Sequence, residues 1–187
     1  MIQRVRKRAP LVHCITNYVA APFQANGLLA LGASPIMADA LEEVEDVAQL
    51  ANSLSLNIGT LRPSTVKAMQ RAGKVANRYN VPIILDPVGA GATPYRLECA
   101  KQLLNTFRID VIRGNVGQIA ALLDVNWQAK GVDAGEGSIY LATLAQQAAK
   151  RFYVVVAISG EIDYVSDGTR VVAIEGGHAL MERITGM

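Results

Sequence analysis

An acidic side chain followed by a glycine-rich turn is the feature of this sequence best suited to chemistry. Asp86 follows the apolar run 81–85 and precedes Pro87, Gly89 and Gly91. Such a run predicts a buried strand, and open α/β sheets bind ligands outside the carboxyl ends of their strands. A carboxylate there can hold Mg²⁺ or orient a hydroxyl group, and glycines let backbone N–H groups approach a phosphate. The alternative is that Asp86 only caps a turn bent by the two glycines.

Other polar or small residues also follow apolar runs. Because parallel strands end at one edge of a sheet, we expect these residues to converge there on a phosphate-handling site. The residues are Asn17, Met37, Asn57, Gly59, Asp86, Arg113, Asn115, Ser159 and Gly160.

Four of these residues also have an ordinary structural interpretation. Arg113 could bind phosphate or form a salt bridge at the rim. Asn17 could bond a ligand or cap the next helix, which is the commoner use of asparagine there. Met37 is a candidate core residue, and Ser159 could be a turn hydroxyl.

Several well-known site patterns are absent from the sequence. It contains no G-x-x-x-x-G-K-[ST] loop, and Pro94 interrupts any G-x-G-x-x-G pattern after Gly89 and Gly91. His13 and His178 do not have metal-ligand spacing with the cysteines. His13 and Cys14 are neighbours on a predicted strand, so they point to opposite faces and cannot form a nucleophilic dyad.

The elements that must position these residues alternate between strands and helices. We expect a single α/β domain over residues 1–187, with a mostly parallel sheet, helices on both faces and a small antiparallel extension. We expect Ser64 to cap a helix over 65–79. The helix over 20–31 consists of small and apolar residues and is predicted to be tightly packed. The strand over 153–158 is predicted to be the most buried strand. Pro35 suits an edge strand. The predicted strands are 11–15, 33–38, 53–59, 81–85, 109–113, 153–158 and the hairpin 161–165 with 169–174; the other helices are 42–51, 95–107, 118–123 and 138–150, and 126–137 is a surface segment that carries Trp127.

Composition restricts the class of protein. The chain of 187 residues is 51% hydrophobic and 18% charged, which excludes a disordered chain. A net charge of +2 gives no support for a nucleic-acid partner. Two cysteines, no signal-peptide pattern and no long apolar run predict a cytoplasmic protein without a membrane partner.

The chain resembles the hydroxyethylthiazole kinase family. The motifs that carry this resemblance lie in the family's order and span nearly the whole sequence. They are LVHCITNYV at 11–19, GASPIMA at 32–38, NIGT at 57–60, LDPVGAGATPYR at 85–96, VIRGN at 111–115, and GH at 177–178 through ITG at 184–186.

The resemblance implies a ribokinase-like fold and a homotrimer with the substrate site between subunits. It also implies ATP- and Mg²⁺-dependent phosphorylation of the hydroxyl group of 4-methyl-5-(2-hydroxyethyl)thiazole in thiamine biosynthesis and salvage. The implied roles are Asp86 as the catalytic and Mg²⁺-holding carboxylate, Arg113 and Ser159 as ATP-binding residues, and Asn17, Met37, Gly59 and Gly186 as substrate-binding residues.

Two departures from the family pattern bear on activity. Gln118 stands where the family's Asn-x-x-Glu motif has a carboxylate, so weaker metal binding is expected. The chain ends at Met187, where the family begins its glycine-rich anion hole, so an incomplete domain with exposed apolar sheet surface is expected. A second hypothesis is therefore a non-catalytic protein that binds the thiazole or a partner. A third is another ribokinase-like vitamin kinase.

Overall fold

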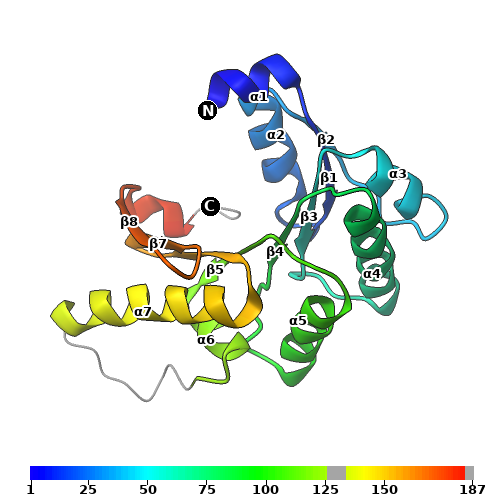
Figure 1. The fold of residues 1–187 in the computed structure, drawn as a ribbon. Helices are drawn as coiled ribbons and strands as arrows, with labels where there is room; N and C mark the ends of the chain where they lie inside the picture. Colours follow the sequence, from blue (N-terminus) through cyan, green and yellow to red (C-terminus); the bar gives the residue numbers. More distant parts are fainter. Residues whose placement is uncertain (126–133, 184–187) are drawn as a thin grey trace.

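A single eight-stranded sheet forms the centre of the molecule. The computed structural model describes residues 1–125 and 134–183, and its strands lie in the order β2-β1-β3-β4-β5-β6-β7-β8 (Figure 1). The strands are β1 Leu11–Ile15, β2 Ser34–Ile36, β3 Ser53–Asn57, β4 Ile83–Asp86, β5 Val111–Asn115, β6 Val155–Ser159, β7 Ile162–Ser166 and β8 Val171–Glu175.

Helices connect most of these strands. They are α1 Ile2–Arg8, α2 Ala21–Leu31, α3 Val44–Leu50, α4 Pro63–Arg78, α5 Pro94–Thr106, α6 Val116–Leu122, α7 Ala134–Phe152 and the short 3-10 helix η2 Ala179–Arg183. Among the described residues, no helix is long and apolar enough to cross a membrane.

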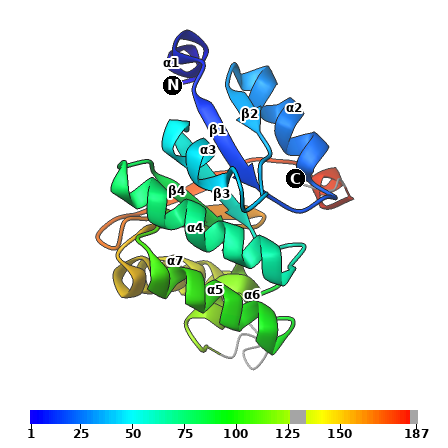
Figure 2. The ribbon, with the colours of Figure 1, turned by 90° about the vertical axis from the view of Figure 1, so that its right-hand side faces the viewer.

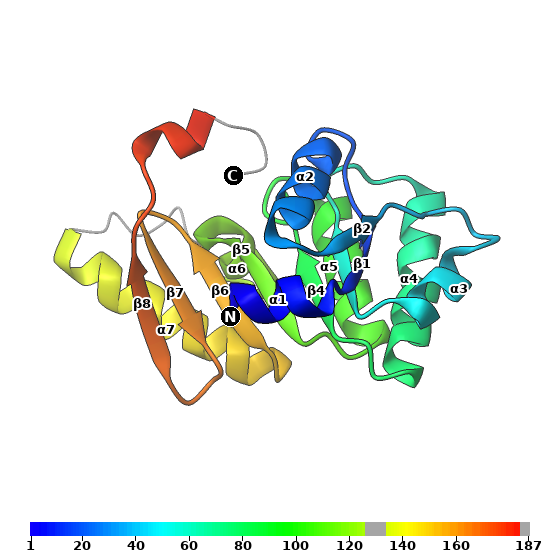
Figure 3. The ribbon, with the colours of Figure 1, turned by 90° about the horizontal axis from the view of Figure 1, so that it is seen from above.

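The predicted sheet is confirmed. Strands β1 to β6 pair in parallel, and β7 and β8 add an antiparallel hairpin at one edge. Figure 3 shows this hairpin and α7 at one end of the molecule, with β1, β2 and α2–α4 toward the other. Pro35 lies in β2, the strand at the opposite edge, where its missing N–H costs no central hydrogen bond.

One face of the sheet carries the core. The strand registers align a transverse row of five buried aliphatic side chains. Helices α3 to α7 lie on this side (Figures 1 and 2), and Ala68, Met69 and Ala72 of α4 belong to the same core. The row consists of Ile15, Leu56, Leu85, Ile112 and Val156.

The opposite face is less covered. Gln24 of α2 donates a hydrogen bond to Ser55 of β3 at 3.1 Å, which places α2 on this side. The strand registers align Ser55 with Ile84 and, through β5, with Val155. On this face Ile84 is 39% exposed and Val155 is 37% exposed. Some apolar side chains of this face are therefore exposed, and helices lie on both faces, although unequally.

Three local predictions were wrong. Helix α4 has Arg62 at its N-cap and begins with Pro63, whose fixed φ suits the first helical turn, so Ser64 does not cap it. Helix α2 has no buried residue. Strand β6 is only partly buried, and Tyr153 before it is 92% exposed. Trp127 and most of the predicted surface segment lie outside the described residues.

Candidate active site

Three polar side chains form a row across neighbouring strands at the carboxyl edge of the sheet. Asn57 ends β3 and pairs in register with Asp86, which ends β4. Arg113 of β5 follows Ile112, the register partner of Leu85. Since side chains alternate along a strand, these three residues project from the face opposite the core.

Asp86 directs one carboxylate oxygen toward its neighbours. Its Oδ2 accepts a hydrogen bond from Asn57 Nδ2 at 2.8 Å and lies 4.0 Å from Arg113 Nη1. Within the described residues no hydrogen bond reaches Oδ1, which leaves this oxygen for a ligand. The interpretation of Asp86 as a turn cap is wrong, because backbone bonds close the following turn, from Ala90 N to Pro87 O and from Ala92 N to Gly89 O.

Burial raises the pKa of the Asp86 carboxyl above its ordinary value, because desolvation disfavours the charged form. The positive charge of Arg113 and the hydrogen bond from Asn57 act in the opposite direction. The ionised carboxylate that would hold a cation therefore depends on these two neighbours.

Arg113 uses few of its donors within the part of the chain that the structure describes. Its ion pair with Asp86 is long, at 4.0 Å, its side chain is 49% exposed, and it donates no hydrogen bond to any residue the structure describes. The salt bridge considered for Arg113 at the rim of the sheet is thus present but weak. Such a guanidinium can accept a phosphate between its N–H groups.

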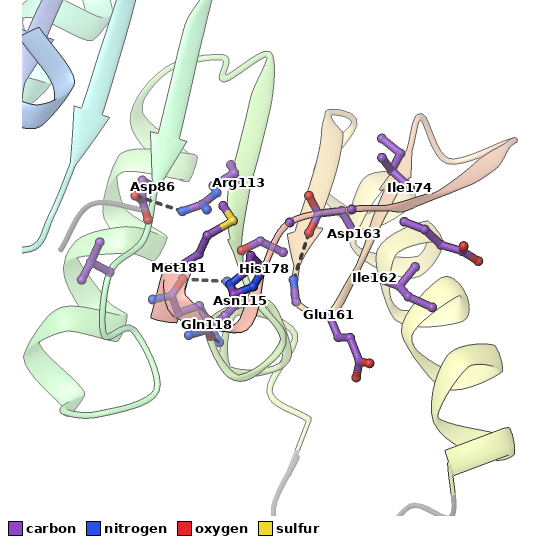
Figure 4. A pocket seen from close by; sticks show the side chains of 16 residues that line it. Asp86, Arg113, Asn115, Gln118, Glu161, Ile162, Asp163, Ile174, His178 and Met181 are labelled. Atoms are coloured by element: carbon purple, nitrogen blue, oxygen red, sulfur yellow. Dashed lines mark hydrogen bonds and ion pairs between the residues drawn. The ribbon is translucent and has the colours of Figure 1, made fainter. Parts of the chain in front are cut away.

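A cleft of about 1340 Å³ opens in front of this row. Figure 4 shows Asp86 and Arg113 facing each other, with Asn115, Gln118, His178 and Met181 around them. Ser159 also lines the cleft, and its hydroxyl donates to Gly114 O at 3.4 Å. The remaining lining residues are Val88, Gly160, Glu161, Ile162, Asp163, Ile174, Glu175, Gly176 and Gly177.

Gln118 has a structural role as well as a place in the cleft. Asn115 N donates to Gln118 Oε1, and Gln118 N donates to Asn115 Oδ1, both at 3.0 Å. This reciprocal pair is a capping box that begins α6. Glutamate can make the same bonds, so the fold does not require a neutral side chain here.

Asn17 and Gly59 lie beyond Asn57, on the side away from Arg113. Asn17 Nδ2 donates to Asn57 Oδ1 at 2.8 Å, while Asn17 Oδ1 accepts from Ala20 N at 2.8 Å. Asn17 therefore helps to start α2, as a cap would, and also reaches the site. A Cβ on Gly59 would lie 2.8 Å from Asn17 Nδ2, so only glycine allows this close approach.

Met37 and Gly186 are not brought into this row. Met37 follows β2 and is 40% exposed, so the prediction of a core residue is wrong. The adjoining carbonyl of Ala38 accepts a hydrogen bond from the buried His13 Nε2 at 2.7 Å. Gly186 lies outside the described residues.

The side chains of this site could supply only some of the ligands of a magnesium ion, with waters and substrate phosphates supplying the others. The described residues contain no group of three or more His, Cys, Asp or Glu side chains that could hold a metal ion. Mg²⁺ often binds through one or two carboxylates together with waters and substrate phosphates. Asp86, whose Oδ1 accepts no hydrogen bond from residues 1–125 or 134–183, and which has Arg113 nearby, meets that requirement.

Two residues that organise the site were given no specific partner from the sequence, although Asn57 was expected at this edge of the sheet. Asn57 bonds to Asn17, Gly59 and Asp86. Arg96 donates to the carbonyl oxygens of Ile58, Gly59 and Val88 at 2.8 to 3.0 Å, which joins the loops after β3 and β4. Ser55 and Asn57 alternate with the buried Leu54 and Leu56, which identifies the face of the sheet on which Asn57 lies. Nothing in the local sequence reveals the hydrogen-bond partners of Asn57.

Known proteins resemble the chain over almost all of its length. The model of the hydroxyethylthiazole kinase family matches residues 2–187. The hydroxyethylthiazole kinase of Lysinibacillus sphaericus (strain C3-41) is 52% identical over 186 residues, which cover 100% of this chain and 73% of that protein. The enzyme of the same name from Listeria monocytogenes serotype 4a (strain HCC23) is 50% identical over 185 residues, covering 99% and 69%.

Solved structures agree with these sequence matches. The hydroxyethylthiazole kinase protein from Pyrococcus horikoshii OT3 superposes with a TM-score of 0.90 at 45% identity, covering 99% of this chain and 69% of that one. Adenosine kinase from Schistosoma mansoni superposes with a TM-score of 0.53 at 11% identity, covering 97% and 64%. The second likeness shows the ribokinase-like fold alone.

Proposed function

This chain belongs to the hydroxyethylthiazole kinase family, and we propose that it transfers the γ-phosphoryl group of ATP to the hydroxyl group of 4-methyl-5-(2-hydroxyethyl)thiazole. This reaction serves thiamine biosynthesis and salvage. The observation that carries the proposal is the placement of Asp86 and Arg113, 4.0 Å apart on adjacent strands and open to one cleft. Phosphoryl transfer needs a cation-holding carboxylate and an anion-binding donor at the same place.

Arg113 and Ser159 form the proposed nucleotide side of the site. The Arg113 guanidinium donates no hydrogen bond among the described residues, so its N–H groups can bind phosphate oxygens. Ser159 lies on the next strand in register with Asn115. Both residues line the cleft that would hold the triphosphate. The chain then contributes mainly by positioning the reactants and by balancing the charge of the transferred group.

Asp86 is the proposed catalytic carboxylate and holds Mg²⁺ together with the phosphates. The bound ion would neutralise charge on the phosphoryl oxygens. Asn57 and Arg113 both act on Oδ2, so these two residues orient the carboxylate, and Oδ1 accepts no hydrogen bond from the described residues.

Asn17, Met37 and Gly59 form the proposed thiazole side, with Gly186 at its phosphate-facing end. Asn17 and Gly59 support this assignment because they adjoin the row of Asn57 and Asp86. Met37 is exposed just after the edge strand β2, where it could meet a substrate held against a second subunit.

Phosphorylation of hydroxyethylthiazole by the purified protein, with ATP and Mg²⁺, tests the proposal. Product that depends on all three components supports it. Thiazole binding without product would favour the non-catalytic hypothesis. Faster phosphorylation of hydroxymethylpyrimidine would favour another vitamin kinase.

Gln118→Glu is expected to lower the Mg²⁺ concentration needed for half-maximal turnover by about tenfold, since a carboxylate adds charge beside the cleft. The capping box is retained, so the melting temperature stays close to that of the original chain. The measurement is a magnesium titration at saturating ATP. Gln49→Glu adds the same charge on the exposed side of α3 and should change nothing. An unchanged magnesium requirement in Gln118→Glu would remove Gln118 from the metal environment.

We also propose that the protein is a homotrimer in solution. Helix α2 supports this, because it has no buried residue and exposes Phe23, Leu29 and Leu31 by 42%, 58% and 45%. Apolar surface of this kind commonly marks an interface. Light scattering is expected to give three times the chain mass, and a monomer mass would contradict the proposal.

A further inference from the structure

We propose that Asn57 is a positioning residue that joins the acceptor-alcohol side of the site to the carboxylate of Asp86. This inference rests on the proposed function, because it assigns Asn17 and Gly59 to the acceptor and Asp86 to phosphoryl transfer. Its basis is a continuous chain of hydrogen bonds through three side chains, Asn17, Asn57 and Asp86, which we call the amide chain.

Backbone donors set the direction of the amide chain. Ala20 N donates to Asn17 Oδ1 at 2.8 Å, so the oxygen of Asn17 faces α2 and its Nδ2 faces Asn57. Gly59 N donates to Asn57 Oδ1 at 2.9 Å, so the oxygen of Asn57 faces Asn17 and Gly59. Because a backbone N–H can only donate, both amide orientations are determined.

Asn57 Nδ2 is consequently the group that meets Asp86. It donates to Oδ2 at 2.8 Å, and the acceptor at this end of the amide chain is a carboxylate. Every donor in the amide chain thus points toward the negative charge, an arrangement in which successive bonds polarise one another. The amide chain thus engages Oδ2, whereas Oδ1 accepts no hydrogen bond from any described residue.

The surroundings leave little room for an alternative arrangement. A Cβ on Gly59 would lie 2.9 Å from Asn57 Oδ1, so the loop after β3 closes directly over this amide. Arg96 holds the carbonyl of Gly59 from the other side at 3.0 Å. A shift of Asn57 would therefore move the loop, Asn17 and Asp86 together.

Two substitutions at Asn57 separate the two halves of this role. In Asn57→Asp, a carboxylate oxygen still accepts from Asn17 and Gly59, but the donor to Asp86 is lost. In Asn57→Ala, all three bonds are lost. Asn77→Ala is the matched control. The Asn77 side chain is likewise held by hydrogen bonds, two of them with the backbone of Arg108, but it lies near the amino ends of the strands, away from the site.

The experiment measures calorimetric binding of hydroxyethylthiazole without nucleotide or Mg²⁺, together with kcat and the acceptor KM. We expect Asn57→Asp to keep acceptor affinity within about threefold while kcat falls about 100-fold, since the bond to the Asp86 carboxylate is replaced by repulsion between two carboxylates whereas the bonds to Asn17 and Gly59 remain. We expect Asn57→Ala to weaken acceptor binding about tenfold as well. Asn77→Ala should lower the melting temperature without changing either constant.

Equal effects of both Asn57 variants on acceptor affinity, or a kcat like that of Asn77→Ala, would overturn the inference. If the original protein binds the thiazole without phosphorylating it, the proposed function fails, whereas the contrast in binding still tests Asn57.

A double-mutant cycle of Asn57→Ala with Asp86→Ala adds a test that needs no ligand. Coupling of about fivefold or more in the unfolding equilibrium supports the inference, and additivity contradicts it.

Discussion

Asp86→Asn is expected to lower kcat by at least about 1000-fold while hydroxyethylthiazole still binds with nearly unchanged affinity. An asparagine has almost the same shape as aspartate, but it has no charge to hold Mg²⁺ beside the phosphates or to attract Arg113. Its amide oxygen can still accept the hydrogen bond from Asn57, so Asn17 and Gly59 keep their positions. The effect should therefore fall on the chemical step and not on acceptor binding.

The measurement pairs turnover of the variant with calorimetric binding of the acceptor. Asp110→Asn is the matched control, because Asp110 is also an acid beside a sheet strand, but it lies at the amino edge and accepts from Ile83 N at 2.8 Å. It should affect stability alone. Turnover of Asp86→Asn at the original rate would show that this carboxylate does not serve the transfer.

The position of the site followed from the order of the elements. Strands and helices alternate, which predicts a parallel sheet, and parallel strands place the residues after their carboxyl ends along one edge. Asp86, Arg113 and Ser159 do line one cleft there. Asn17 and Gly59 lie next to them through Asn57.

The contacts within the site did not follow from the sequence, because they depend on register between strands distant in the chain. Asn57 meets Asp86 only because β3 and β4 pair in that register, and a shift of one residue would turn Asn57 to the other face. Its local pattern is compatible with an ordinary solvent-facing asparagine.

The burial of individual elements was also predicted poorly, because it depends on which parts of the chain pack against them. The composition of α2 is apolar and suggests a packed helix, yet its burial depends on what lies against it, and none of its residues is buried. Val155 belongs to a strongly apolar run but lies on the less covered face, so it remains 37% exposed. Hydrophobicity alone does not distinguish the two faces of a strand that is apolar throughout.

Arg113→Met is expected to raise the KM for ATP by about 10- to 100-fold and to lower kcat, with acceptor affinity unchanged. The methionine keeps much of the aliphatic length but cannot donate to phosphate oxygens. Since Arg113 makes no hydrogen bond within the described residues and only a 4.0 Å ion pair, its loss should cost little stability. A residue kept for folding would show the reverse pattern.

Steady-state kinetics at varied ATP, with thermal unfolding of the same samples, measures this. Arg108→Met is the matched control, because Arg108 lies just before β5, at the amino edge, and pairs with Asp110 at 3.6 Å. Its ATP KM should not change. Arg113→Lys restores the charge without the planar fork, so it should recover only part of the loss. If Arg113→Met kept the original ATP KM but unfolded more easily, the ion pair with Asp86 would be structural and the phosphates would bind elsewhere in the cleft.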